Sequence, residues 1–402
     1  MLYTLLILFI GASWVYWVVA WWWTREFFYI TQKPDGSFTP PVSILKPVKG
    51  LDVQAYQNFE SFCEQIYPEY ELLFGVADPD DPVIPVIQRL QKNFPKLTIR
   101  LIITPYFIGT NRKASILHFL AAQANYEMLV ISDSDMRVDD DYLMRVVSPL
   151  SNEQVGLVTC PYRGELPKTF TARLETLYIG VTFLPSVIVG RKVLKMRFAL
   201  GSTAVVRKKD LKEIGGFASI ANYLADDYQL GFQIAALGLQ VVLSDYVVGT
   251  ILGATTFKEQ WDREVRWLQC TRISRPWEYP GLLLSFSTPL SAILVLFSPF
   301  NFSNWVYLIT SILLRWSVGW LVAGYTKDNE SRRWLYWLPL RDMLSALIWL
   351  VALLLRHIVW RGEEYILNSD GLLEPLHSSQ DLPESGRARA DGKVQEKYLK
   401  KE

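Results

Sequence analysis

The stretch MLVISDSD, residues 128–135, joins a short apolar run to two closely spaced carboxylates. The run Met128–Ile131 is typical of a buried strand, and Asp133-Ser134-Asp135 follows it directly. Two carboxylates at positions i and i+2 that leave a strand together can share one divalent cation, and oxygen ligands suit Mg²⁺ or Mn²⁺. An Asp-x-Asp triplet is also common in solvated turns, so its place after an apolar strand is what favours a metal site.

Other short apolar runs accompany this one along the chain. They are Val42–Leu45, Leu72–Ala77, Ile99–Ile103 and Val155–Thr159. Helical patterns lie between the runs, over Asp52–Gln65, Val83–Asn93 and Arg112–Gln123. This alternation predicts an α/β fold with a mostly parallel sheet that is covered by helices. Functional side chains in such sheets gather at the carboxyl ends of the strands.

The start of the chain predicts a membrane anchor, followed by a soluble domain. Residues 1–24 contain no charge, and a transmembrane helix needs about 20 apolar residues. A signal peptide would need a basic start and a small-residue cleavage site, and neither is present. Residues 42–280 have the composition of a soluble domain. Basic residues flank this domain on the side of the predicted spans, so we expect it to face the cytoplasm.

The chain becomes apolar again in its last third. Residues 281–360 are expected to form a C-terminal membrane region. Its candidate spans are Leu282–Phe297, Trp305–Tyr325 and Trp334–Trp360. Arg315 interrupts the second candidate and needs a partner or a position inside a bundle. Arg341 and Asp342 leave open a re-entrant or interfacial helix in place of the third span. Residues 361–402 are charged and poor in aromatic residues, which predicts a tail.

Charge and cysteine content exclude several classes of protein. The formal net charge is +1, whereas a general nucleic-acid binder normally carries a strong basic excess. The three cysteines are far apart in the sequence, so we expect neither a disulfide framework nor a cysteine zinc site. Half of the residues are hydrophobic and 15 are Trp, which suits a protein with aromatic-rich membrane interfaces.

Two further acidic clusters accompany the Asp-x-Asp triplet. Asp81 lies in a proline-flanked turn that follows the run Leu72–Ala77, where a plain acidic turn is an equal alternative. Asp227 follows Asp226 ahead of an amphipathic helical pattern. Carboxylates at that position could simply cap the helix. Adjacent like charges also raise one pKa toward the range that a general base needs.

Two basic motifs could face an anion. Lys113 ends the segment GTNRK, residues 109–113, which enters a helix and could favour phosphate; an ordinary helix start is the alternative. Arg263 and Arg266 are three residues apart and share a helix face, where two guanidiniums can grip a diphosphate above Trp267. On pattern alone, a basic interfacial helix ahead of the spans is the favoured explanation of that segment.

Taken in order, these elements resemble the ceramide glucosyltransferase family and its bacterial relatives, which include glycosyltransferases that act on hopanoids. The family pattern is three aspartates followed by a (Q/R)xxRW motif. Its positions fall here on Asp81, Asp133, Asp227, Arg263, Arg266 and Trp267. The segment SILKPVKG at Ser43–Gly50 also looks like the family, and Trp334–Leu367 looks closer to the bacterial members. The resemblance therefore favours a protein of the bacterial inner membrane.

The resemblance implies a GT-A fold for residues 42–280, with transmembrane helices at both ends of the chain. It implies inverting transfer of a hexose, glucose or N-acetylglucosamine, from a UDP-sugar to the hydroxyl of a membrane lipid. A ceramide, a hopanoid and a diacylglycerol are the candidate acceptors. A processive polysaccharide synthase, which usually has Gln at the position of Arg263, is the nearest alternative. A non-catalytic membrane binding protein is the alternative from another class.

Residue roles also follow from the resemblance. The implied donor-binding residues are Asp81, Lys113, Asp133, Arg263, Arg266 and Trp267. Asp133 and Asp135 would hold Mg²⁺ or Mn²⁺ at the diphosphate, and Asp227 would deprotonate the acceptor hydroxyl. Animal members have Gly at the position of Asp135, so the complete Asp-x-Asp of this chain favours metal use.

Overall fold

The computed structural model describes residues 1–30, 36–355, 357–360, 363–368 and 371–375. Its main sheet has seven strands. In spatial order they are β3 (Thr98–Ile103), β2 (Tyr70–Val76), β1 (Val42–Pro47), β4 (Met128–Ser132), β8 (Thr203–Arg207), β6 (Val155–Thr159) and β9 (Gln240–Leu243). Only β8 runs antiparallel to its neighbours, so the other strands all point the same way. The predicted α/β fold with a mostly parallel sheet is confirmed.

Alternation of side chains along each strand builds a hydrophobic layer on both faces of this sheet. Leu73 of β2 packs into one layer and its neighbour Leu72 into the other. The first layer includes α4 (Arg112–Gln123) and α9 (Asp226–Ala236); the second includes α2 (Ala55–Cys63), α3 (Ile84–Asn93) and α5 (Tyr142–Val147). Helix α4 lies very close to the sheet, because a Cβ added at Gly75 would come within 2.4 Å of Ile116 Cγ2. This contact fixes the start of α4 at the carboxyl edge of the strands.

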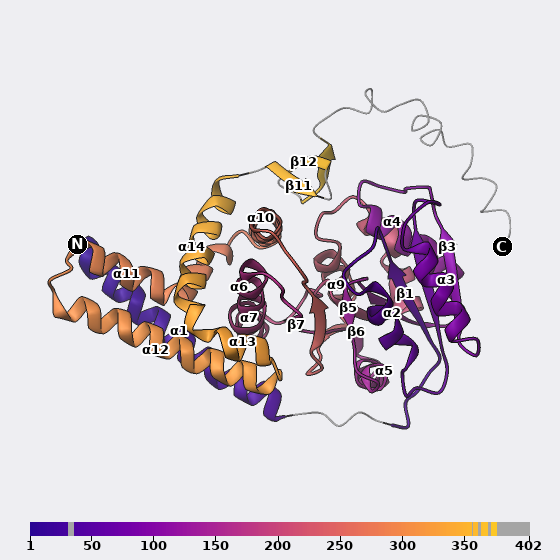
Figure 1. Cartoon of the computed structure of the whole chain (residues 1–402), viewed down its shortest axis with the longest axis horizontal. Helices are drawn as coiled ribbons and strands as arrows, with labels where there is room; N and C mark the ends of the chain where they lie inside the picture. The colour runs from indigo at the N-terminus through magenta and orange to yellow at the C-terminus, as the bar shows by residue number, and fades with distance from the viewer. Residues whose placement is uncertain (31–35, 356, 361–362, 369–370, 376–402) are drawn as a thin grey trace.

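A second sheet extends from the Asp-x-Asp triplet toward the apolar helices. Its strands, in spatial order, are β5 (Met136–Arg137), β10 (Val248–Ile251) and β7 (Tyr162–Glu165). Strand β5 begins directly after Asp135, and β10 is antiparallel to β5 and parallel to β7. In Figure 1 this sheet lies between the main sheet and a group of helices that includes α6 and α10. It therefore joins the acidic triplet to the apolar part of the molecule.

Within the described residues, four helices are long and apolar enough to cross a membrane. They are Leu2–Tyr29 (α1), Phe170–Leu194, Phe302–Tyr325 (α12) and Asn329–Leu354. The second combines α6 (Phe170–Tyr178), a π-helical turn η2 (Ile179–Phe183) and α7 (Leu184–Leu194). The fourth combines α13 (Asn329–Trp334), η5 (Leu335–Trp337) and α14 (Leu338–Leu354). Helices α1 and α12 match spans that the sequence predicts, whereas the helix of residues 170–194 lies inside the segment that was expected to be soluble.

The other apolar helices differ from the expected spans. The first C-terminal candidate is two helices, η4 (Tyr279–Ser285) and α11 (Ser287–Phe297), which are bent by 69°. The third candidate is helical only as far as Leu354, and His357–Trp360 form strand β11. That strand pairs with β12 (Glu363–Leu367), which pairs with β13 (Leu373–Pro375). Part of the expected tail is thus a small antiparallel sheet, and residues 376–402 lie outside the described part.

The remaining helices are short and connect these elements. They are α8 (Lys208–Glu213), α10 (Phe257–Ser274), η1 (Ser148–Ser151) and η3 (Gly216–Ile220). Helix α10 is the longest of them, and Figure 1 shows it beside α6 and α14.

A buried ion pair holds the apolar helices together. The guanidinium of Arg315 on α12 reaches Asp342 on α14, with Nε–Oδ2 at 3.0 Å and Nη2–Oδ1 at 2.8 Å. Both side chains are at most 2 % exposed, and Arg315 also lies over the ring of Trp17 at 3.8 Å. The prediction that Arg315 needs a partner or a position inside a bundle is therefore confirmed.

We predict that Arg315→Ala destabilises the protein by about 3–5 kcal/mol, because it leaves the carboxylate of Asp342 buried without a counter-charge. The double variant Arg315→Met with Asp342→Leu is expected to lose much less, since no uncompensated charge remains. Thermal unfolding of the purified variants in detergent measures both. A double variant less stable than Arg315→Ala would show that the pair matters through more than charge.

Candidate active site

The acidic triplet is tied to helix α4 by an ion pair. Lys113 Nζ lies 2.6 Å from Asp133 Oδ1 and 3.5 Å from the carbonyl oxygen of Gly201. Burial by itself lowers the pKa of Lys113, because it disfavours the charged ammonium. The attraction of the nearby carboxylates, Asp133 first, outweighs this effect, so the pKa is raised and Lys113 stays charged. Asp133 is thus held at the carboxyl edge of β4 by a lysine from the next layer.

Protein groups accept hydrogen bonds from several backbone amides at the start of α4. Asn111 caps the helix, accepting a hydrogen bond from Ala114 N at 3.0 Å. The backbone amides of Thr110 and Asn111 donate to Asn222 Oδ1 and to the carbonyl oxygen of Ala221. Side-chain capping of this kind is what an ordinary helix start shows, and the phosphate role of the segment stays a prediction. Its contribution to the site is the side chain of Lys113.

A second lysine also contacts the acidic triplet, and the sequence did not identify it as a site residue. Lys46 on β1 is fully buried, and its Nζ donates to the carbonyl oxygen of Asp133 at 3.0 Å and to Ser132 Oγ at 3.3 Å. The ammonium lies 3.5 Å from the ring centroid of Phe62. Burial lowers the pKa of Lys46 to about 7. The available signal was a lysine inside the apolar strand Val42–Pro47.

Asp135 faces the second sheet. Its Oδ2 accepts a hydrogen bond from Thr250 Oγ1 at 3.0 Å, and its carbonyl oxygen accepts from Ile251 N. Burial raises the pKa of Asp135 to about 6, and the charges of Asp133 and Asp52 add to the effect. Such mutual repulsion between carboxylates is relieved by a cation. The donor set therefore fits a divalent ion.

The described residues contain no group of three or more His, Cys, Asp or Glu side chains that could hold a metal by themselves. Two carboxylates completed by water and by substrate phosphates are the usual environment of protein-bound Mg²⁺. Asp133 and Asp135 fit that pattern.

Asp227 lies across Gly201 from Asp133. A Cβ added at Gly201 would come within 3.0 Å of Asp227 Oδ2 and 4.0 Å of Asp133 Oδ2. Asp227 is in the first turn of α9, where its Oδ1 accepts from Tyr228 N at 2.8 Å. Burial raises the pKa of Asp227 to about 6; the neighbouring charge of Asp226 adds to this and Lys113 opposes it. The expected effect of the carboxylate pair is present, but burial is the larger cause.

Asp81 joins two loops at the same edge of the sheet. Its Oδ2 accepts from Gly50 N and its Oδ1 from Val83 N, both at 2.9 Å, and the residue is 6 % exposed. Gly50 follows β1 and Val83 precedes α3, so this carboxylate fixes the loops that follow β1 and β2. A plain acidic turn would not bury its carboxylate in this way.

The RxxRW motif lies on α10 and faces α6. Arg263 Nε is 2.9 Å from Glu175 Oε1, and Trp267 stacks on Tyr178 with ring centroids 6.5 Å apart. Arg266 lies on the same helix, as the three-residue spacing predicts. Glu175 was missed in the sequence, because one acid in an amphipathic helix carries no distinguishing signal.

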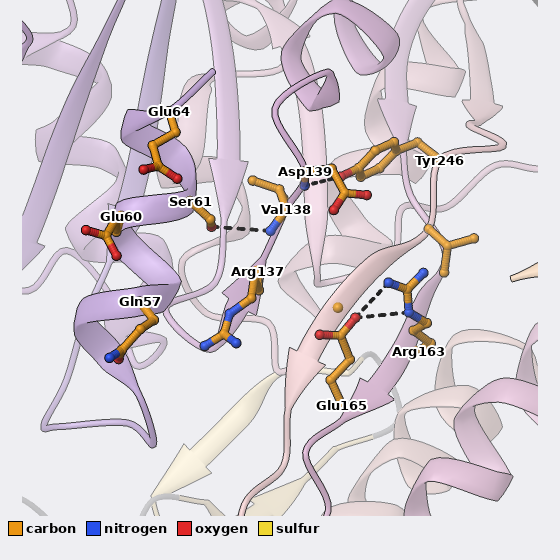
Figure 2. A pocket seen from close by; sticks show the side chains of 12 residues that line it. Gln57, Glu60, Ser61, Glu64, Arg137, Val138, Asp139, Arg163, Glu165 and Tyr246 are labelled. Carbon is orange, nitrogen blue, oxygen red and sulfur yellow. Dashed lines mark hydrogen bonds and ion pairs between the residues drawn. The ribbon is translucent and has the colours of Figure 1, made fainter. Parts of the chain in front are cut away.

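A cavity of about 360 Å³ lies between α2, β5, β7 and β10. Figure 2 shows its charged lining, with Glu60 and Glu64 on one side and the paired Arg163 and Glu165 on the other. None of the predicted site residues lines it. The acidic cluster of Asp133, Asp135 and Asp227 is therefore identified by its charges and contacts and not by this cavity.

The mostly parallel sheet, with acidic residues at its carboxyl edge and a second sheet beside it, has the arrangement of the GT-A fold. A mannosyltransferase from Pyrobaculum calidifontis, solved in complex with GDP-Man and Mn²⁺, has a similar fold: the TM-score is 0.55 at 18 % identity, over 88 % of this chain and 98 % of that one. The sequence profile of glycosyl transferase family 21 matches residues 4–373, and the chain belongs to this family.

Two relatives from Caenorhabditis elegans support the assignment. Ceramide glucosyltransferase 3 is 28 % identical over 358 residues, which cover 85 % of this chain and 76 % of the relative. Ceramide glucosyltransferase 1 is 25 % identical over 365 residues, which cover 88 % and 77 %. The resemblance to the ceramide glucosyltransferase family is confirmed, and the chain is a glycosyltransferase. The alternative of a non-catalytic binding protein is wrong.

We predict that kcat/KM rises with pH through about 6, the pKa of Asp227, because only the ionised carboxylate can accept a proton. The variant Asp226→Asn removes the adjacent like charge and should move this limb of the profile to lower pH. Initial rates between pH 5 and pH 8 give the midpoint of this limb for both proteins. We expect the midpoint to move by on the order of one pH unit, the usual scale of pKa shifts in proteins. If the limb stays at the same pH in Asp226→Asn, it does not report the ionisation of Asp227.

Proposed function

We propose that the protein transfers a hexose from a UDP-sugar to the hydroxyl of a membrane lipid, with inversion at the sugar carbon. The observation that carries this proposal is the half-buried carboxylate of Asp227, which lies beside Gly201 together with that of Asp133. An inverting transfer needs one base, on the side of the sugar opposite the leaving diphosphate. We assign that role to Asp227, and Asp133 would lie near the diphosphate.

The donor would lie along the carboxyl edge of the sheet. Asp133 and Asp135 would hold Mg²⁺ or Mn²⁺, a cation that can neutralise charge on the diphosphate. Asp81 fixes two loops at this edge and would contact the uridine end. Lys113 would keep Asp133 in place beside it. Arg263, Arg266 and Trp267 would close over the diphosphate from α10.

The acceptor would reach the site from a bilayer. Helix α10 lies between the α/β domain and the apolar helices (Figure 1), and it carries the motif that we assign to the diphosphate. An acceptor with its hydroxyl headgroup at the interface could react while its chains stay in the membrane. The names of the relatives favour glucose and a ceramide, and a hopanoid polyol or a diacylglycerol has the same required hydroxyl.

A processive polysaccharide synthase is the weaker alternative. Such a synthase usually has Gln where this chain has Arg263, and it needs a larger bundle of spans to form a channel. Within the described residues, four straight helices meet the requirements of a span. Transfer of one sugar to a lipid is the simpler use of this arrangement.

The proposal is tested with purified protein in mixed micelles that contain UDP-glucose and one acceptor at a time. We expect UDP release with ceramide, diacylglycerol or hopanoid polyol, and little with water-soluble sugars. Asp227→Asn should reduce turnover by about 10²–10⁴, the usual cost of losing a general base, and leave UDP affinity nearly unchanged. Near-normal turnover in this variant, or preference for a soluble acceptor, would overturn the proposal.

Metal dependence is the next prediction. Activity should require Mg²⁺ or Mn²⁺, because two negative carboxylates would repel a departing diphosphate unless a cation balances the charge. Asp135→Ala should lower activity and raise the metal concentration needed for half-maximal rate. Titration with each ion after treatment with EDTA measures both. Full activity in excess EDTA would leave Asp133 and Asp135 with hydrogen-bonding roles only.

We further propose that the α/β domain faces the cytoplasm, where UDP-sugars are made, and that the protein resides in a bacterial inner membrane. Lys212 is exposed on α8 and offers a site for a reporter cysteine. An impermeant maleimide should label Lys212→Cys in lysed cells but not in intact ones. Labelling in intact cells would place the domain on the other side.

A further inference from the structure

Glu175 is a carboxylate buried in the apolar part of the molecule, and Arg263 is its ion-pair partner. Its side chain is 0 % exposed on α6. Arg263 reaches it from α10, with Nε 2.9 Å from Oε1 and Nη2 3.3 Å from Oε2. Only the second contact is aligned as a hydrogen bond. A buried carboxylate is costly unless it is paired, so this contact constrains where the guanidinium can lie.

The pair uses only one edge of the guanidinium. Arginine has five N–H donors in a planar fork, and the contact with Glu175 takes the edge formed by Nε and Nη2. In the part of the chain that the structure describes, Nη1 of Arg263 has no hydrogen-bond partner. The side chain of Arg263 is 31 % exposed. The outer edge, formed by Nη1 and Nη2, is therefore available to a second anion.

Contacts through the second sheet place this pair next to the acidic cluster. The Cβ of a residue at Gly164 on β7 would come within 2.6 Å of Thr176 Oγ1, so β7 and α6 touch. Gly164 pairs with Thr250 on β10, whose hydroxyl is bonded to Asp135. Burial raises the pKa of Tyr162 on β7, and the nearby charges of Asp227, Glu175 and Asp135 all add to the effect.

Two other ion pairs in the same helices lack an open edge. Arg341 pairs with Glu264 and Arg315 with Asp342, and all four side chains are at most 2 % exposed. Those arginines are enclosed together with their partners. Arg263 differs, because its carboxylate partner is enclosed while the guanidinium itself is partly open.

We propose that Glu175 is a positioning residue, which holds Arg263 by its inner edge so that the outer edge faces the diphosphate of the donor. This inference rests on the proposed function, since it takes a nucleotide diphosphate as the ligand. Charge-assisted contacts to a diphosphate depend strongly on geometry, and an arginine fixed beforehand loses less entropy on binding.

The test is the affinity for UDP, measured by titration calorimetry in the presence of Mn²⁺. We expect Glu175→Gln to weaken UDP binding by about tenfold or more, the scale of one charged hydrogen bond. In a double-mutant cycle, Glu175→Gln should weaken binding little further once Arg263 is Ala, because both changes remove the same contact. Glu175→Asp keeps the charge and should recover part of the affinity, and it carries the same comparison if the Gln variant does not fold.

Asp342→Asn is the matched control, since it breaks a buried ion pair between two other apolar helices, α12 and α14. It should lower the melting temperature and leave UDP affinity as in the wild type. Unchanged UDP affinity in Glu175→Gln, or additive losses in the cycle, would overturn the inference. Failure of the proposed function is a different outcome: wild-type protein would then bind UDP with the expected sensitivity to Glu175 but transfer no sugar to any lipid.

Discussion

The ion pair between Lys113 and Asp133 is the contact on which the site depends. Three carboxylates gather within a small space at the carboxyl edge of the sheet, and burial raises the pKa of Asp135 and of Asp227 to about 6. Such a cluster repels itself unless cations balance it. Lys113 supplies one from α4, and Lys46 fixes the same loop from within the sheet. A metal ion and the basic residues of α10 can supply the positive charge that is still needed.

The same principle organises the apolar helices. Arg315, Arg341 and the partly exposed Arg263 are each paired with a buried acid on another helix, and the pairs link α12 to α14, α14 to α10 and α10 to α6. Charges that would be costly alone thus become cross-links between helices. Through them α10 is held against α6 and α14, and its motif is kept in a fixed relation to the acidic cluster.

Much of the fold was predictable, because buried strands and the helices between them leave apolar runs of recognisable length. The helix of residues 170–194 was missed, since its apolar run begins with charged positions that suit a soluble helix. At the site, motif order marked Asp133 and Asp227, but Lys46 and Glu175 were missed. Each is a single charged residue in an apolar element, and only packing in three dimensions shows that its partner is functional.

The most direct test of the account is the configuration of the glycosidic bond in the lipid product. Purified protein would be given UDP-glucose, which has an α-linked sugar, and a lipid acceptor in nanodiscs, and the product would be examined by proton NMR. A single displacement with Asp227 as the base predicts a β-linked glucolipid. An α-linked product would require two displacements, and the arrangement of one base across Gly201 from Asp133 would then be the wrong explanation of the site.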